Sequence, residues 1–159
     1  MKKYKLKADQ PVHIFNVKID GFTDEINEKP YRRIAISSDS TLYDLAEAVI
    51  DSWDFFFDHA FGFYDNFKRT QDSNEGYELF KDIGEDSKFP GVEKTKLDGV
   101  FPKPGKSMLF IFDYGDEWRF ILKCVGIELP DSVKRYPCVL KKDGPSPEQY
   151  PDYCDSEIE

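Results

Sequence analysis

The chain has 159 residues, and a domain of this length buries roughly 70% of the surface that its unfolded chain exposes. Hydrophobic residues make up 40% and aromatic residues 16% of the sequence, which excludes wholesale disorder. With 22 basic and 31 acidic residues the formal net charge is −9. This charge argues against a nucleic-acid partner, because affinity for nucleic acids comes largely from neutralised phosphates.

The composition also predicts a compartment. No apolar segment follows the first lysines, so we expect no signal peptide, and no apolar run is long enough to span a membrane. Cys124, Cys138 and Cys154 lack CxxC spacing and predict neither a disulfide framework nor a zinc knuckle. We therefore expect a cytoplasmic protein without membrane attachment.

Two strands are predicted in the first part of the chain. Residues 13–19 alternate between two sides with a period of two, which is typical of a half-buried strand. Residues 31–37 form the second strand, with Ile34 and Ile36 on one face and Arg33 on the other.

An amphipathic helix follows. Asp39-Ser40-Thr41 offers N-cap oxygens, and apolar residues recur at helical spacing from Leu42 to Trp53. This single apolar stripe predicts a helix that covers one face of a sheet. Residues 59–64 then alternate again and predict a third strand.

The next segment, residues 65–107, is rich in charged residues, glycine and proline, with isolated apolar islands. A structureless loop of this length is unusual inside a compact domain. We therefore expect a long excursion folded back onto the core, with a short helix near residues 77–83. Two more strands are predicted at residues 107–113 and 118–128.

The predicted order is β-β-α-β-(long excursion)-β-β. It indicates an α+β fold, a two-layer sandwich in which one main amphipathic helix lies across a mostly antiparallel sheet of about five strands. Residues 1–159 are predicted to form a single domain, with a core at residues 12–151 and a solvated acidic tail at residues 152–159. The acidic residues of this tail are Asp152, Asp155, Glu157 and Glu159.

The hairpin at residues 112–119 gathers three carboxylates, a tryptophan and an arginine at one tip. Polar groups on a loop of a rigid scaffold often carry function, although this sequence is equally consistent with a purely architectural turn. We predict a positive φ at Gly115, with Asp113 or Asp116 accepting a backbone N–H. Trp118 is expected in the core.

Arg119 is expected on the opposite strand face from Trp118, where it can hold a carboxylate from this protein or from a ligand. It is the nearest candidate partner for the hairpin carboxylates. A second use of those carboxylates is to bind a divalent cation, Mg²⁺, Mn²⁺ or Zn²⁺. In that case Asp113, Asp116 and Glu117 are ligands, and His59 completes the shell if the third strand begins beside the hairpin.

Two proline-containing segments follow the last predicted strand: Tyr136-Pro137-Cys138 and residues 144–151. Their tyrosines serve as apolar anchors. The segments either close the sheet or form the rim of a binding cleft next to the hairpin, and both interpretations remain open.

Several blocks together resemble the plasmid Orf3-like family, named after the third open reading frame of an Agrobacterium Ri plasmid. The matching residues are Tyr31-Arg32-Arg33-Ile34, the helix from Thr41 to Trp53, His59 with Phe61, the block Phe112 to Arg119, Tyr136-Pro137 and Pro147-Glu148. The match covers most of residues 12–151, and the hairpin block is its most specific part. The resemblance implies an α+β fold and no established activity.

The chain departs from the family pattern at two positions and in its ending. Many relatives carry a tryptophan where Tyr31 stands, a histidine where Phe120 stands, and an ending richer in cysteine and glycine than residues 144–150. The missing histidine weakens any metal or acid–base role for the hairpin strand. Some relatives carry a resolvase label, but a serine recombinase needs a nucleophilic serine among arginines and a DNA-binding surface, and neither is visible in this acidic chain.

The hypothesis that we favour is a non-catalytic binding module. Its predicted binding residues are Asp113, Asp116, Glu117, Arg119, Tyr136 and Tyr150. An exposed aromatic and acidic patch suits a basic peptide or protein segment. No cofactor is predicted, apart from the divalent metal of the second hypothesis, a hydrolase-like enzyme. A third hypothesis, a mobile-element DNA-binding protein, rests only on the family label.

Overall fold

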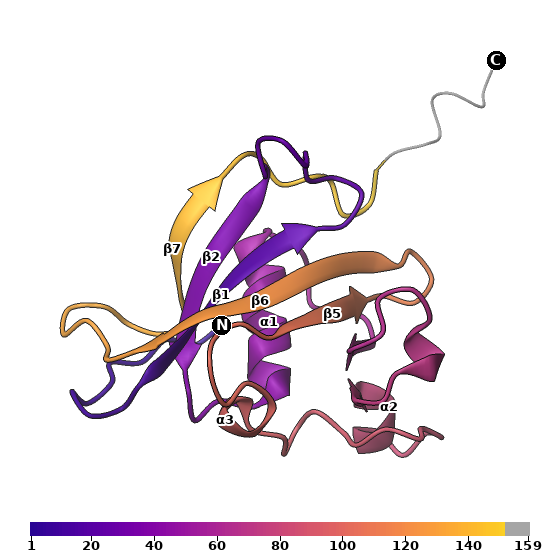
Figure 1. Cartoon of the computed structure of the whole chain (residues 1–159), viewed down its shortest axis with the longest axis horizontal. Helices are drawn as coiled ribbons and strands as arrows, with labels where there is room; N and C mark the ends of the chain where they lie inside the picture. Colours follow the sequence, from indigo (N-terminus) through magenta and orange to yellow (C-terminus); the bar gives the residue numbers. More distant parts are fainter. Residues whose placement is uncertain (152–159) are drawn as a thin grey trace.

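The computed structural model describes residues 1–151, and its largest element is one seven-stranded sheet with the order β4-β3-β5-β6-β1-β2-β7 (Figure 1). The strands are β1 (Val12–Ile19), β2 (Tyr31–Ser37), β3 (Phe61–Tyr64), β4 (Gly76–Glu78), β5 (Ser107–Phe112), β6 (Trp118–Glu128) and β7 (Cys138–Asp143). Every neighbouring pair is antiparallel. The predicted acidic tail lies outside the described residues.

The sheet has two strands that the sequence analysis missed, and both are edges. β4 has only three residues, and β7 is largely exposed and carries two adjacent lysines. Edge strands are often short and charged, so they lack the alternating apolar pattern of a half-buried strand. The mostly antiparallel sheet with few helices agrees with the predicted α+β class, while the expected count of about five strands is corrected to seven.

Helix α1 (Leu42–Ser52) packs on one face of this sheet. The Thr41 hydroxyl accepts the Asp44 N–H at 3.2 Å, and the Asp44 carboxylate accepts the Thr41 N–H at 3.0 Å. This capping box starts the helix at the predicted position. Its apolar stripe is buried against the inward residues of the central strands in the main core, and Figure 1 shows α1 behind β1 and β6.

The other face of the sheet is covered only at its two ends. At one end Val12, Ile14, Ala35 and Tyr136 form a small cluster. At the other end Tyr64, Phe89, Leu109 and Ile111 pack beneath the excursion. Between these clusters the face is open, and its side chains, which are mostly polar but include Ile121, are half-buried or exposed.

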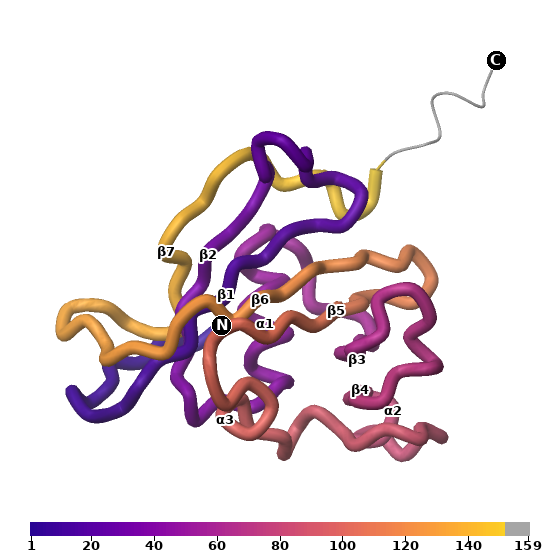
Figure 2. Tube along the Cα trace, viewed as in Figure 1, coloured from indigo at the N-terminus to yellow at the C-terminus, as the bar shows by residue number. Residues whose placement is uncertain are grey.

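The excursion at residues 65–107 folds back onto the core, as predicted, and Figure 2 traces it past β3 and β4. It contains a 3₁₀ turn (Thr70–Asp72), β4, α2 (Leu79–Asp82) and α3 (Leu97–Val100). The short helix expected near residues 77–83 is α2. The excursion supplies the second layer that holds the β3 side of the sheet in place.

Candidate functional site

The tip of the β5–β6 hairpin is a loop of residues 113–117, because Phe112 pairs with Trp118. The Asp113 carboxylate oxygen Oδ1 accepts the N–H of Gly115 at 3.1 Å and that of Asp116 at 3.3 Å. This confirms that Asp113 organises the turn through backbone N–H groups.

The prediction of a positive φ at Gly115 is wrong. The left-handed residues are instead Asp113, with φ of 65°, and Glu117, with φ of 52°. The backbone reverses direction at the first and last residues of the loop, Asp113 and Glu117. These two residues are joined by a hydrogen bond in which the Glu117 N–H donates to the Asp113 carbonyl at 2.6 Å. The glycine therefore sits in the middle of the loop, where no special backbone conformation is needed.

This geometry predicts the stability of two variants. A left-handed conformation costs a non-glycine residue roughly 1–2 kcal/mol, so Glu117→Gly is expected to raise the free energy of unfolding by about 0.5–1 kcal/mol. A Cβ on Gly115 would lie 3.3 Å from the Asp113 carboxylate, and Gly115→Ala is expected to change stability by less than about 0.5 kcal/mol. Urea denaturation measures both, and a destabilised Glu117→Gly would contradict the assignment of strain.

The first two residues of β6 point to opposite faces, as predicted. Trp118 is 8% exposed and packs in the core, with ring centroids 4.8 Å from Phe55 and 5.4 Å from Phe22. The Arg119 Nε donates to the Asp20 carboxylate at 3.2 Å, and its guanidinium also donates to the Phe67 carbonyl. The partner of Arg119 is thus Asp20 rather than a hairpin carboxylate.

The strap, which we define as residues 144–151, is anchored by the buried side chain of Arg32. This guanidinium donates to the Ser52 carbonyl, the Gly144 carbonyl and the Ser146 hydroxyl, each at 2.9 Å, and lies 4.1 Å over the ring of Trp53. Its burial lowers the pKa of Arg32, and the nearby acidic residues only partly oppose this. Arg32 thereby joins the end of α1 to the start of the strap.

The far end of the strap is held by two more side chains. Gln149 accepts the Phe56 N–H at 2.7 Å and donates to the Phe56 carbonyl at 3.0 Å. The Tyr150 hydroxyl donates to Asp58 at 2.8 Å and lies 3.0 Å from the His59 Nε2. The strap is therefore pinned to the segment between α1 and β3.

His59 connects the strap to the hairpin. Its Nε2 lies 3.3 Å from the Asp113 carboxylate as well as close to Tyr150. The strand expected at residues 59–64 begins at Phe61, so it is the segment just before β3 that lies beside the hairpin. Because both contacts use the same ring nitrogen, the imidazole cannot relay a proton from one partner to the other.

Together the hairpin and the strap line one cavity of about 460 Å³. The residues that line it are Ile19, Asp20, Phe22, Asp116, Glu117, Trp118, Arg119, Pro147, Glu148, Gln149, Tyr150 and Pro151. Phe22 and Tyr150 are about half exposed. Within residues 1–151, Asp116, Glu117 and Glu148 form no ion pair. The cavity is therefore bordered by aromatic rings and uncompensated carboxylates.

Sequence reasoning identified part of this cavity and missed part of it. It named Asp116, Glu117, Arg119 and Tyr150, all of which line the cavity. The missed residues include Phe22 in the β1–β2 connection. For the wall formed by the strap, the signal available in the sequence was the proline-rich pattern around Glu148.

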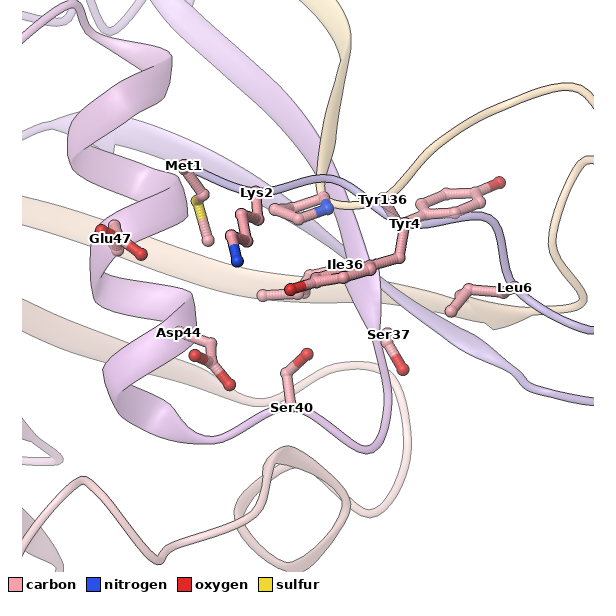
Figure 3. A pocket seen from close by; sticks show the side chains of 11 residues that line it. Met1, Lys2, Tyr4, Leu6, Ile36, Ser37, Ser40, Asp44, Glu47 and Tyr136 are labelled. Atoms are coloured by element: carbon pink, nitrogen blue, oxygen red, sulfur yellow. The ribbon is translucent and has the colours of Figure 1, made fainter.

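Tyr136 lies at a different hollow. It is 4% exposed, and its hydroxyl accepts the Asp131 N–H at 2.9 Å. It lines a hollow of about 390 Å³ between the N-terminal segment, β2 and α1 (Figure 3), where Asp44 and Glu47 project from the helix. The structure thus separates the two tyrosines that the sequence analysis placed on one binding face.

The carboxylates of the hairpin do not converge on a metal centre in the described part of the chain. Among residues 1–151 no group of three or more His, Cys, Asp or Glu side chains is placed to hold a metal ion. His59 meets Asp113, but one oxygen of Asp113 accepts the loop N–H groups, whereas Asp116 and Glu117 line the cavity. The divalent-metal hypothesis therefore lacks a ligand set there.

No helix within residues 1–151 combines the length and the apolar character needed to cross a bilayer.

Tyr150 makes the docking of the strap dependent on pH. Desolvation and the hydrogen bond to Asp58 raise the pKa of Tyr150 to about 12, against about 10 for a free tyrosine. Its contribution to docking is complete below pH of about 10 and is lost as the pH approaches about 12. The near-ultraviolet titration of the wild type minus that of Tyr150→Phe is expected to show one phenol with a midpoint near 12, and a midpoint near 10 would refute the contact.

With this geometry established, comparison with known proteins gives a family. The family model described as plasmid pRiA4b ORF-3-like protein matches residues 12–151. This chain belongs to that family. The matched region of the Orf3-like protein begins at β1 and includes both the hairpin and the whole strap, so the resemblance expected from the sequence is confirmed.

A solved structure has a similar fold. The crystal structure of a protein of unknown function from Methanosarcina mazei Go1 superposes with a TM-score of 0.66 at 21% identity, covering 84% of the Orf3-like chain and 69% of that chain. At this identity the similarity concerns the fold alone. No match was found among curated proteins.

Proposed function

We propose that this Orf3-like protein is a non-catalytic binding module whose cavity between the hairpin and the strap receives a basic segment of a partner protein. The observation that supports this most is the pairing of uncompensated carboxylates, Asp116, Glu117 and Glu148, with the half-exposed rings of Phe22 and Tyr150. A lysine or arginine gains from both groups, because carboxylates accept charge-assisted hydrogen bonds and aromatic faces attract cations.

His59 helps to hold the two walls of the cavity together. Its Nε2 lies near Asp58, Asp113 and Tyr150 at once, an arrangement that holds the strap against the hairpin. A cytoplasmic location remains part of this proposal and rests on the sequence alone.

The proposal is tested by titrating the protein with a hexalysine peptide in a calorimeter at low ionic strength. The double variant Asp116→Asn/Glu148→Gln is expected to bind at least about tenfold more weakly, which corresponds to about 1.4 kcal/mol. Glu85→Gln is the matched control, because Glu85 is an exposed carboxylate that does not line the cavity, and it is expected to bind like the wild type.

Three results would count against the proposal. They are no binding of hexalysine by the wild type at millimolar concentration, equal binding by the folded double variant, and equal loss in Glu85→Gln. A single-stranded oligothymidine measured in parallel tests the mobile-element hypothesis, which predicts binding that falls steeply with salt.

A further inference from the structure

The open part of the sheet carries cations on three of four neighbouring strands. Lys141 on β7 stands opposite Arg33 on β2, Arg33 stands opposite Asn16 on β1, and Asn16 stands opposite Lys123 on β6. The Arg33 Nε donates to the Asn16 side chain at 2.9 Å, and the Lys141 Nζ lies 5.6 Å from the ring centroid of Tyr31 on the same face. We call Arg33, Lys123 and Lys141 the basic row.

The fold compensates these charges only in part, through the attraction between Asp143 and Lys141 along β7. Within residues 1–151, no member of the basic row forms an ion pair. Two other cations on this face are paired: Lys18 with Glu28 at 2.8 Å and Arg119 with Asp20 at 3.2 Å.

The row brings like charges together. Arg33 and Lys141 face each other directly, and like charges at directly opposite positions of a sheet repel each other. The hydrogen bond with Tyr31 and the attraction of Asp143 outweigh this repulsion and raise the pKa of Lys141. The chain carries a net charge of −9 and offers many carboxylates elsewhere. Cations aligned without an ion pair in such a chain indicate that an anionic partner comes from another molecule.

We propose that the basic row is a docking surface for an acidic segment of a partner protein. Neighbouring strands lie about 4.7–4.9 Å apart, and acidic side chains three or four residues apart on a helix are separated by about 5–6 Å. A helix with such an acidic face therefore presents carboxylates at nearly the spacing of Arg33 and Lys141 on neighbouring strands, while Lys123 lies two strands from Arg33, beyond Asn16. The two covered ends of the sheet face leave this middle part accessible.

A nucleic acid suits this surface less well. Proteins that bind single strands without sequence preference stack bases on exposed aromatic side chains, and the aromatic residue beside the row, Tyr31, already faces Lys141. The basic row shares no residue with the cavity of the hairpin and strap, so this proposal does not depend on the proposed function.

The test uses the full chain and a helical peptide with glutamates at i, i+4 and i+8, measured by fluorescence anisotropy. The triple variant Arg33→Gln/Lys123→Gln/Lys141→Gln is expected to bind at least about tenfold more weakly than the wild type. Lys142→Gln is the matched control: Lys142 is adjacent on β7 but pairs with Asp54 on the opposite face, and its replacement is expected to leave binding unchanged.

The melting temperature gives a second readout that does not depend on the peptide. Lys141→Gln removes the repulsion with Arg33 together with the contact to Tyr31, so it is expected to leave the melting temperature nearly unchanged while weakening binding. If the triple variant does not fold by circular dichroism, Lys123→Gln and Lys141→Gln replace it, because both side chains are exposed, and each is expected to weaken binding about threefold.

The proposal is overturned if the wild type does not bind the peptide at millimolar concentration, or if the folded variants bind it like the wild type. Tighter binding of an oligothymidine of equal charge at the same ionic strength would overturn it in favour of nucleic acid. Asp116→Asn/Glu148→Gln is expected to keep its affinity for the acidic peptide, which separates this result from that of the cavity.

Discussion

Replacing Arg32 with methionine is expected to lower the free energy of unfolding by about 3–5 kcal/mol, because it leaves several buried acceptors without a donor. The guanidinium is fully buried and donates to Ser52, Gly144 and Ser146 while it stacks on Trp53. Arg32→Lys keeps the charge but loses the planar fork, so it is expected to recover only a minor part of this stability.

The neighbouring arginine supplies the control. Arg33 is half-buried on the open face and makes a single side-chain hydrogen bond, to Asn16, so Arg33→Met is expected to cost less than about 1 kcal/mol. Chemical denaturation measures both variants. Equal losses would show that Arg32 does not hold the end of α1 and the strap together.

The second large effect is expected at Gly62 on β3. A Cβ there would lie 2.5 Å from the Tyr114 hydroxyl and 2.6 Å from the Tyr64 hydroxyl, so Gly62→Ala is expected to destabilise the fold by about 2–3 kcal/mol. The Tyr64 ring has little room to withdraw. Tyr64 is buried against Phe89, and its hydroxyl hydrogen-bonds Glu78 and lies 2.6 Å from that of Tyr114.

This hydroxyl cluster also reaches the hairpin. Tyr114 belongs to the hairpin loop and packs on Phe80 with ring centroids 5.0 Å apart, and burial raises the pKa values of Tyr64 and Tyr114, so both phenols stay protonated at neutral pH. A Cβ on Gly62 therefore pushes on the residue that fixes the loop next to the cavity.

Two further variants test the steric explanation. Tyr114→Phe removes one of the clashing hydroxyls, so the pair Gly62→Ala/Tyr114→Phe is expected to show a coupling energy of about 1 kcal/mol in a double-mutant cycle. Gly99 in α3 is the control, because a Cβ added there would have no neighbouring atom within 4 Å, and Gly99→Ala is expected to be neutral or stabilising by up to about 1 kcal/mol. Strict additivity of the pair would rule out the clash.

Local patterns in the sequence were sufficient for the elements that bury one face. Strands β1 and β2, the hairpin strands β5 and β6, and helix α1 lie close to their predicted positions, because burying one side imposes a period of two on a strand and 3.6 on a helix. The edge strands β4 and β7 bury few side chains, so their sequences show no alternation of apolar and polar residues. One signal in the same pattern was not used. Arg32 lies on the same face of β2 as the buried Ile34 and Ile36, which indicates that its side chain is buried too.

The sequence by itself determined the fold class, the central strands, helix α1 and the acidic character of the hairpin, since each depends on residues close together in the chain. Only the tertiary structure decided that Arg32 is buried on Trp53, that His59 contacts both Tyr150 and Asp113 of the hairpin, and that Tyr136 belongs to another hollow. These contacts join residues that are far apart in sequence. Local periodicity carries no information about them, because they are set by the order of strands in the sheet and by the path of the strap across it.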